Sequence, residues 1–313
     1  MFKKMLCVLF VLLLVFSAAC SSQNHDVGKE NPGDGSSATS GEQNGQSDTS
    51  SATENITSQK TQFRTMTFNI RNGEFTDARI DLVLHMIHTY SPDTFGVQEA
   101  TVEWMQVLKS YLGDKYECVG VGRNADGTGE ASAVFYLKSK FELLDGGTKW
   151  LSETPDVPGS KIESSEYIRI FSYVKLKIKE TGKIFVHVNT HLDNSTDKVR
   201  SKQAIYILNF LEQYKTEGIP LVLTGDFNCS STSNCYSRIT INGLQDSLSV
   251  AKEAESGPTY HAYGKLGLVI DYIFVSNGTE VSKFKVCNET FENEDGTVAY
   301  PSDHNPVIID YLV

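Results

Sequence analysis

The feature that most limits the fold is a set of four short polar segments, each beside an apolar run typical of a β-strand. They are Gln98–Glu99, Thr190–Asp193, Gly225–Asn228 and Ser302–Pro306. Each contains carboxylate, amide or imidazole groups, yet long stretches of chain separate one segment from the next. No local structure requires such groups at such separations. A scaffold that brings many strand ends to one place does require them, because functional side chains are commonly held at the ends of rigid elements.

Apolar spacing predicts helices at Asp77–Tyr90, Val102–Leu112 and Lys198–Tyr214. Alternating or continuous apolar runs predict strands at Phe63–Ile70, Thr94–Val97, Tyr116–Val121, Ala133–Leu137, Phe141–Asp145, Arg169–Ile178, Lys183–Thr190, Pro220–Thr224, Leu268–Val275 and Pro306–Tyr311. Strands therefore outnumber helices, and helices recur between them. This pattern favours two stacked sheets with helices on their outer faces.

Residues 1–19 have the order of a signal peptide. Lys3 and Lys4 form a basic start, Leu6–Phe16 is apolar, and small residues precede Cys20. The apolar part is too short for a comfortable transmembrane helix. Cleavage before Cys20 would leave this cysteine first, as in bacterial lipoproteins, and its lipid would hold the protein on the extracytoplasmic face of the cell membrane. Plain secretion and a retained helical anchor are the alternatives.

Residues 20–60 follow as a polar segment. The hydrophobic residues after Cys20 are few: Val27, Ala38, Ala52 and Ile56. Such a segment cannot bury enough apolar surface to offset the entropy of ordering it. We therefore expect a flexible tether with no partner of its own, followed by a single domain over residues 61–313.

The net charge of the chain is −11, and the sequence has no run of Lys or Arg of the kind that binds nucleic acid. This argues against tight binding of a duplex. It does not exclude a nuclease, because divalent cations in a site can meet phosphates in place of basic side chains. We find no internal repeat and expect a monomer.

Four cysteines fall in the domain: Cys118, Cys229, Cys235 and Cys287. Cys229 and Cys235 flank a short loop directly after Gly225–Asn228. An extracytoplasmic setting permits a disulfide between them, which would stiffen the loop. Free buried thiols are an equally good interpretation, and no cysteine spacing resembles a zinc site.

Asp226 and Asn228 follow an apolar strand and are two residues apart, so in an extended chain they face the same side. The carboxylate of Asp226 can accept a proton from water, and the amide of Asn228 can hold that water or an ester oxygen. The alternative is an Asx-rich turn that ends the strand.

Glu99, Asn69 and Asp303 offer hard oxygen donors of the kind that Mg²⁺ or Mn²⁺ prefers. Glu99 ends a predicted strand and is the principal candidate ligand; otherwise it is a solvated residue capping the next helix. Asn69 is a neutral oxygen ligand, a hydrogen-bond partner of Glu99 or a simple turn former. Asp303 adds a second carboxylate on the metal side.

His187, Asn189 and His191 share one parity of a predicted strand. His191 lies at the strand end, beside the polar pair Asp193–Asn194, where an imidazole can hydrogen bond a phosphate oxygen as charge grows in a transition state. We expect Asp193 to contact substrate. His187 is interpreted as a packed or surface histidine.

Asp271 lies within an apolar strand, where a carboxylate needs a partner because an unpaired buried charge is costly. We predict His304 as that partner, with Asp271 orienting the imidazole and favouring its protonated form. A structural ion pair with Lys or Arg is the alternative.

Three further residues are candidates for contacting substrate. Arg123 and Tyr136 flank the loop that contains Asp126, Gly127 and Glu130, in and after the Gly-rich segment Gly122–Gly129. His261 follows Thr259–Tyr260, with no stronger signal than its type. For each of them a structural role is as well supported.

Taken together and in order, six motifs resemble those of the endonuclease/exonuclease/phosphatase superfamily, which includes DNase I-like nucleases: Thr67–Ile70, Gln98–Glu99, Asn189–Asn194, Gly225–Asn228, Ile270–Phe274 and Ser302–Pro306. Trp150–Pro155 and Gly122–Arg123 resemble a bacterial branch of metal-dependent hydrolases. The chain departs from this pattern at 161–166, where an aromatic-bearing segment is replaced by polar residues.

The resemblance implies a four-layer α/β sandwich, with two packed, mostly antiparallel sheets flanked by helices. It implies Glu99 as the principal Mg²⁺ ligand with Asn69 beside it, and Asp226 and Asn228 as the residues that activate and position water. His191 and His304 would stabilise the phosphate, with Asp271 behind His304.

The resulting hypothesis is a lipid-anchored, Mg²⁺- or Mn²⁺-dependent phosphoesterase. The substrate stays open among nucleic acid, a lipid headgroup as in sphingomyelin, and sugar or inositol phosphates. The rival class is a binding lipoprotein that keeps the fold without catalysis, and the complete set of polar motifs argues against it.

Overall fold

The computed structural model describes residues 61–73 and 75–313, all of which belong to one compact unit, Ile56–Val313. The predicted signal peptide, the lipidated Cys20 and the tether lie outside the described residues. The helices are α1 (Asp77–Tyr90), α2 (Val102–Leu112), α3 (Asp197–Thr216), α4 (Asn234–Ile241) and α5 (Ser247–Val250). No helix in this described part is long and apolar enough to cross a membrane.

Two large sheets form the centre of the domain. In spatial order the first contains β10 (Glu253–Glu255), β12 (Val281–Val286), β15 (Val307–Leu312), β1 (Gln62–Asn69), β2 (Thr94–Ala100), β4 (Ala131–Leu137) and β3 (Tyr116–Val119). The second contains β5 (Phe141–Trp150), β6 (Ile170–Ile178), β7 (Ile184–His191), β8 (Leu221–Asp226), β11 (Asp271–Ser276) and β9 (Leu244–Asp246). A separate short hairpin pairs β13 (Phe291–Glu292) with β14 (Val298–Ala299).

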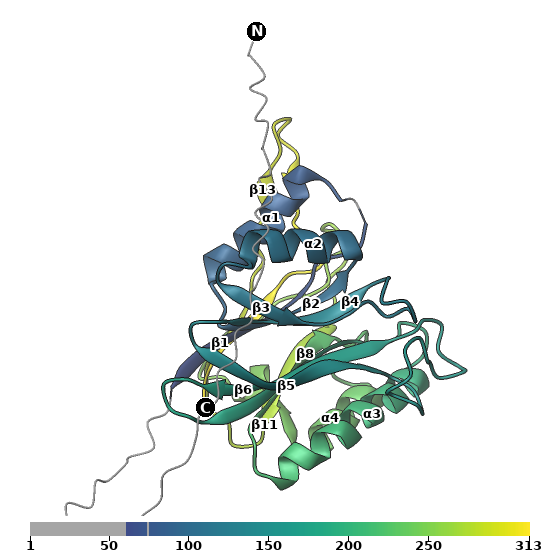
Figure 1. Cartoon of the computed structure of the whole chain (residues 1–313). Coiled ribbons are helices and arrows are strands. Elements are labelled where there is room, and N and C mark those ends of the chain that lie inside the picture. Colours follow the sequence, from purple (N-terminus) through teal and green to yellow (C-terminus); the bar gives the residue numbers. More distant parts are fainter. Residues whose placement is uncertain (1–60, 74) are drawn as a thin grey trace, which may run out of the picture. The chain divides into compact units, whose positions relative to one another are not determined.

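The sheets stack face to face and helices cover their outer faces, with α1 and α2 over the first sheet and α3 and α4 over the second (Figure 1). Apolar side chains fill each of the three interfaces between layers. The layer between the two sheets includes Phe63, Phe185, Ile273 and Ile309. The predicted four-layer α/β sandwich is confirmed.

Local sequence explains the helix boundaries. Threonine side chains cap the starts of α1, α2 and α3: Thr76, Thr101 and Thr196 each accept a hydrogen bond from a backbone N–H of the first turn. Helix α1 ends at Ser91 in the left-handed region, directly before Pro92, which cannot continue a helix.

Strand directions bring the polar segments to one edge. β1 runs parallel to β2, and β7 runs parallel to β8, so the carboxyl ends of these four strands point the same way within their sheets. β15 and β4 are antiparallel to this set in the first sheet, and β6 and β11 are antiparallel to it in the second. The starts of these four antiparallel strands therefore lie at the same edge.

The sequence analysis missed the shortest elements, which are β9, β10, β13, β14 and α5, and it also missed β12 and α4. In β12 a register shift between Val281 and Lys283 interrupts the alternation of buried and exposed residues, so the period of two is lost. In α4 the buried side chains are Cys235 and Ile239, too few for a helical pattern to stand out.

A layer of buried polar side chains lies between the two sheets. His187 contacts Thr94 Oγ1 at 3.1 Å and Thr224 Oγ1 at 2.9 Å, so it is packed, as one of its two interpretations held. Gln98 Nε2 donates to Asn189 Oδ1 at 2.6 Å across the sheets. These bonds allow polar side chains to be buried without large cost.

Gly96 lets the sheets approach at this layer. A Cβ there would lie 2.3 Å from Asn189 Oδ1 and 2.7 Å from Thr224 Oγ1. We expect Gly96→Ala to lower the free energy of unfolding by about 1–3 kcal/mol, the usual effect of overpacking. Urea denaturation measures this. Gly257→Ala, where a Cβ meets nothing within 4 Å, is the control; equal stability of the two variants would contradict the prediction.

Candidate active site

A cleft of about 460 Å³ opens at the edge where the strand ends meet. It contains seven of the residues predicted to form the site: Glu99, Arg123, His191, Asp226, Asn228, Asp303 and His304. Asn69 and Asp271 lie beneath them and contact their side chains. The chain therefore assembles one site from segments far apart in the sequence.

Glu99 reaches the cleft because strand β2 is irregular there. The register with β4 shifts between Val97 and Ala100, and Glu99 has a φ of 59°, which is rare for a residue with a side chain. Gln98 instead points between the sheets. The Glu99 carboxylate accepts hydrogen bonds from Asn69 Nδ2 at 3.1 Å and from the Asn72 N–H at 3.0 Å.

Asp226 is 2% exposed and lies at the centre of the site. Its carboxylate accepts hydrogen bonds from Asn69 Nδ2 at 2.9 Å and from the Asn228 N–H at 2.9 Å. Asp271 is its cross-strand partner in β11. Burial and the charge of Asp271 raise the pKa of Asp226 to about 7, although His304 and the two hydrogen bonds act in the opposite direction. A carboxylate with such a pKa can accept a proton near neutral pH.

His304 and Asp271 form the predicted pair. His304 Nδ1 lies 2.9 Å from Asp271 Oδ2, and Nε2 lies 3.8 Å from Asp226 Oδ2. Burial alone would lower the pKa of His304, but Asp271, Asp226 and Asp303 together raise it to about 10. His304 is therefore a cation at neutral pH, with Asp271 fixing its orientation.

His191 has the opposite electrostatics. Burial, Arg169, His304 and Arg123 hold its pKa well below the ordinary value, so the ring is neutral. Asn228 Nδ2 donates to His191 Nε2 at 3.0 Å and to the Leu192 carbonyl at 3.0 Å. Asn228 has a φ of 50°, and these bonds hold its amide in the cleft.

The oxygen donors fit a divalent cation. Glu99 and Asp303 present carboxylates to the same cleft, and ligand atoms of Asp226, Asp271 and His304 lie within 4.8 Å of one another. Hard carboxylate oxygens suit Mg²⁺ or Mn²⁺. Of the predicted roles of Asn69, the structure has the hydrogen-bond partner of Glu99: its Nδ2 donates to the carboxylates, and its Oδ1 accepts the Arg71 N–H at 2.9 Å. Asn69 thus holds the carboxylates in place.

The prediction that Tyr136 contacts substrate is wrong. It pairs with Thr94, the first residue of β2, at the end of the sheet away from Glu99. Its ring is buried between the sheets and its hydroxyl donates to Glu117 Oε2 at 2.7 Å. The prediction failed because strand β4 runs away from the cleft between residues 131 and 137.

The predictions that Asp193 and His261 contact substrate are also wrong. Asp193 is fully buried and accepts hydrogen bonds from Ser165 Oγ at 2.7 Å and the Tyr167 N–H at 2.9 Å. Burial alone would raise its pKa, but hydrogen bonds from Ser195, Tyr167 and Ser165 bring it to about 2. His261 is buried against Tyr300, and its neighbour Tyr260 lines the cleft instead.

The cleft also contains residues that the sequence analysis did not single out as site residues: Asn72, Glu130, Tyr167, Arg169, Asn194, Tyr260, Leu268 and Ile270. Two of them had a usable signal. Glu130 and Arg169 directly precede β4 and β6, the strands antiparallel to β2 and β7. The other site residues were predicted because they are polar residues at strand ends, and the same reasoning applies to these two.

Cys229 and Cys235 are free in the structure and both are buried. A hydrogen bond between the two thiols lowers the pKa of Cys229, against the effect of burial. Of the two interpretations, the structure has the free thiols.

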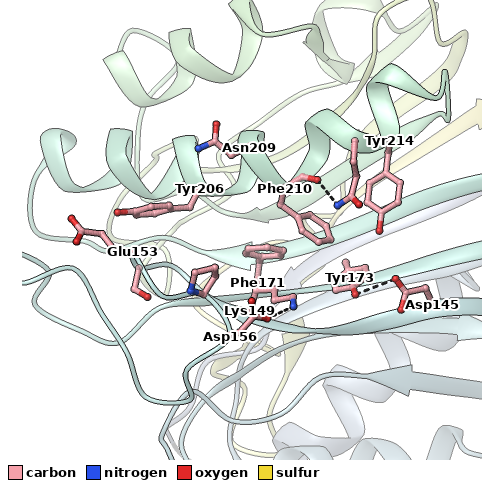
Figure 2. Close-up of a pocket in the computed structure, with 13 residues that line it drawn as sticks. Asp145, Lys149, Glu153, Asp156, Phe171, Tyr173, Tyr206, Asn209, Phe210 and Tyr214 are labelled. Atoms are coloured by element: carbon pink, nitrogen blue, oxygen red, sulfur yellow. Dashed lines mark hydrogen bonds and ion pairs between the residues drawn. The ribbon is translucent and has the colours of Figure 1, made fainter.

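A second hollow, of about 490 Å³, lies between α3 and strands β5 and β6. Figure 2 shows the rings of Phe171 and Phe210 facing each other inside it, with the ion pair of Lys149 and Asp156 at its rim. Its lining has no histidine and shares no residue with the cleft. The predicted catalytic residues therefore line the cleft and not this hollow.

The fold and the site define a hydrolase that acts on phosphoester bonds. The chain belongs to the endonuclease/exonuclease/phosphatase family, whose family model matches residues 66–304.

Solved bacterial structures of this family are similar to the chain. An endonuclease/exonuclease/phosphatase family protein from Bacteroides thetaiotaomicron is 31% identical with a TM-score of 0.75, covering 81% of this chain and 98% of its own. The mannosyl-6-phosphatase of the same species is 32% identical with a TM-score of 0.74, covering 80% of this chain and 99% of its own.

Among curated relatives, nocturnin of Rattus norvegicus is 27% identical over an alignment of 258 residues, and the match covers 74% of this chain and 57% of nocturnin. The match thus spans little more than half the length of that relative.

Proposed function

We propose that the protein is a divalent-metal-dependent phosphoesterase that uses activated water to hydrolyse a small phosphate ester. The observation that carries the proposal is the meeting of Asp226, Asn228, Glu99 and the His304–Asp271 pair in one cleft. The signal-like residues 1–19 and Cys20 support anchoring through a lipid on the extracytoplasmic face of the cell membrane, and we propose that the enzyme acts there as a monomer.

The reaction follows from the two carboxylates and two imidazoles. Asn228 positions a water molecule, whose oxygen forms a bond to phosphorus while its proton passes to Asp226. The bond from phosphorus to the alcohol oxygen breaks, and this oxygen takes up a proton from solvent. His304, a cation oriented by Asp271, donates from Nε2 to a phosphate oxygen as negative charge develops.

His191 is neutral, and its Nε2 accepts a hydrogen bond from the side-chain amide of Asn228. It therefore acts by orienting Asn228. Glu99 and Asp303 would hold Mg²⁺ or Mn²⁺, with Asn69 fixing the orientation of Glu99. When bound, such a cation supplies positive charge that stabilises the phosphate oxygens in the transition state.

Three observations support a small substrate such as a sugar phosphate. The cleft, at about 460 Å³, has the size of a small-molecule site. A family member at 32% identity is a mannosyl-6-phosphatase, and the chain has no basic run for a long polyanion. Nucleic acid is the competing substrate class, because a Ccr4-type 3'-5'-exoribonuclease subunit from Vairimorpha ceranae is 28% identical over 272 residues.

The test is a substrate panel with metal removal. Purified residues 61–313 should hydrolyse a phosphate ester in Mg²⁺ or Mn²⁺, lose the activity in EDTA and regain it when the metal is returned. The panel contains mannose 6-phosphate, an inositol phosphate, sphingomyelin, DNA and RNA. Turnover of sugar phosphate above the others supports the proposal. Metal-independent turnover contradicts the roles of Glu99 and Asp303, and preferred cleavage of RNA or DNA replaces the sugar phosphate by a nucleic acid.

A further inference from the structure

One wall of the cleft is built from two arginines around an aromatic ring. Arg123 and Arg169 both line the cleft together with Tyr167, and both guanidinium groups lie close to the Tyr167 ring. The Cζ atoms of Arg123 and Arg169 lie 5.3 Å and 5.2 Å from the ring centroid. Stacking of this kind holds a guanidinium flat while its N–H groups stay available to donate.

Positive charge on this wall exceeds the negative charge that compensates it. Glu130 forms a 2.6 Å ion pair with Arg123 and lies 3.8 Å from Arg169 NH1. The other carboxylate oxygen of Glu130 already accepts a hydrogen bond from Asn72 Nδ2 at 2.6 Å. Arg169 is 5% exposed, and its Nε has no partner among the described residues. Besides Glu130, the charges of Asp226 and Asp193 favour the ionised Arg169, but burial still lowers its pKa. An anion bound to this buried guanidinium would therefore stabilise it.

The wall is rigid because the backbones of its members are fixed from behind. Trp150 Nε1 donates to the Arg123 carbonyl at 2.7 Å, and the Leu151 N–H donates to the Arg169 carbonyl at 2.8 Å. Asp193 holds the Tyr167 N–H at 2.9 Å. The backbones that carry the two arginines and the ring are thus held in place, which is the preorganisation expected of a binding site.

The wall adjoins the reacting groups. A narrow pocket is lined by Glu99, Arg123, Arg169 and His191 together. Arg169 and Arg123 are also near enough to depress the pKa of His191. An anion placed against the arginines is therefore the phosphate on which Asp226 and His304 act, rather than a distant group of the substrate.

We propose that Arg123 and Arg169 bind the terminal oxygens of a phosphate monoester and make the site prefer a monoester to a diester. This rests on the proposed function. A monoester carries nearly one more negative charge at neutral pH and a third terminal oxygen, which matches two fork-shaped donors with one shared carboxylate. A diester has a second carbon substituent where that oxygen would lie.

The experiment compares Arg169→Gln and Arg123→Gln in the full chain with p-nitrophenyl phosphate and bis(p-nitrophenyl) phosphate in Mg²⁺. We expect kcat/KM for the monoester to fall about 10- to 100-fold, as when one hydrogen bond to a charged group is lost, with a smaller change for the diester. Arg238→Gln, at an exposed position of α4, is the matched control and should retain both activities. Circular dichroism confirms that each variant is folded.

Equal losses on the two substrates, or no loss, would overturn the proposal. If Arg169→Gln does not fold, Tyr167→Leu is the second variant, because it removes the ring that both guanidinium groups contact. It should lower the ratio of kcat/KM for the monoester to kcat/KM for the diester. Calorimetric binding of inorganic phosphate tests the arginine subsite independently of the proposed hydrolysis. A wild-type chain without hydrolysis that still binds phosphate, and loses binding in Arg169→Gln, refutes the proposed function and supports the subsite. Unchanged binding in that variant refutes the subsite.

Discussion

Asp226→Ala is expected to lower kcat by about 10²- to 10⁴-fold, the range associated with loss of a positioned general base. The carboxylate is buried, faces His304 Nε2 at 3.8 Å and has its pKa raised to about 7 by burial and by Asp271. No other carboxylate in the described cleft combines a hydrogen bond to the Asn228 N–H with this pKa. Steady-state rates at saturating Mg²⁺ and substrate measure the effect.

Asp295→Ala is the matched control for Asp226, because Asp295 is an exposed carboxylate that bonds only to Thr297 nearby in sequence. Its kcat should equal that of the wild type. Asp226→Asn tests the charge alone: it keeps the shape but cannot take the proton, so it should be almost as slow as Asp226→Ala. A near-normal rate in both Asp226 variants, with the fold intact, would place the base elsewhere.

His304→Ala is expected to lower kcat by about 10²- to 10³-fold, as when a donor to developing negative charge is removed. Asp271→Asn gives a more specific readout. His304 is protonated below its pKa, which Asp271, Asp226 and Asp303 raise to about 10 despite burial. Without the charge of Asp271 this pKa falls, so the protonated donor is lost at a lower pH. The alkaline limb of the kcat–pH profile should therefore move to lower pH.

A purely structural Asp271 would reduce stability without moving that limb, so the pH profile distinguishes the two roles. His85→Ala, at an exposed position of α1, controls for loss of an imidazole and should leave the profile unchanged. An alkaline limb at the same pH in Asp271→Asn and wild type would contradict the role assigned to the pair.

Periodicity predicted helices better than strands. Both ends of α1 and α2 match the prediction because a Thr cap starts each helix and a clear stop follows. Strand β5 extends to Trp150, well beyond the predicted end at Asp145, because residues 146–149 have no apolar pattern of their own and are held by pairing with β6. Pairing across strands is a long-range interaction, and no local pattern reports it.

Some site residues could be predicted from the local sequence, and others could not. His304 and Asp271 were predictable because a buried carboxylate needs a partner, and the structure confirms their contact at 2.9 Å. Tyr136 was assigned to the cleft on its proximity in sequence to the Gly-rich segment, yet it lies at the far end of β4. Arg169 was overlooked because it stands before a strand with no motif around it.

By itself the sequence determined which groups are available for chemistry and which apolar runs must be buried, because residue type and period are local properties of the chain. The tertiary structure decided which of those groups meet. The bulge that turns Glu99 into the cleft, the amide orientation of Asn69 and the shared carboxylate between Arg123 and Arg169 all arise from strands paired across long separations. Contacts of that kind depend on the register of the whole sheet, and no single segment encodes them.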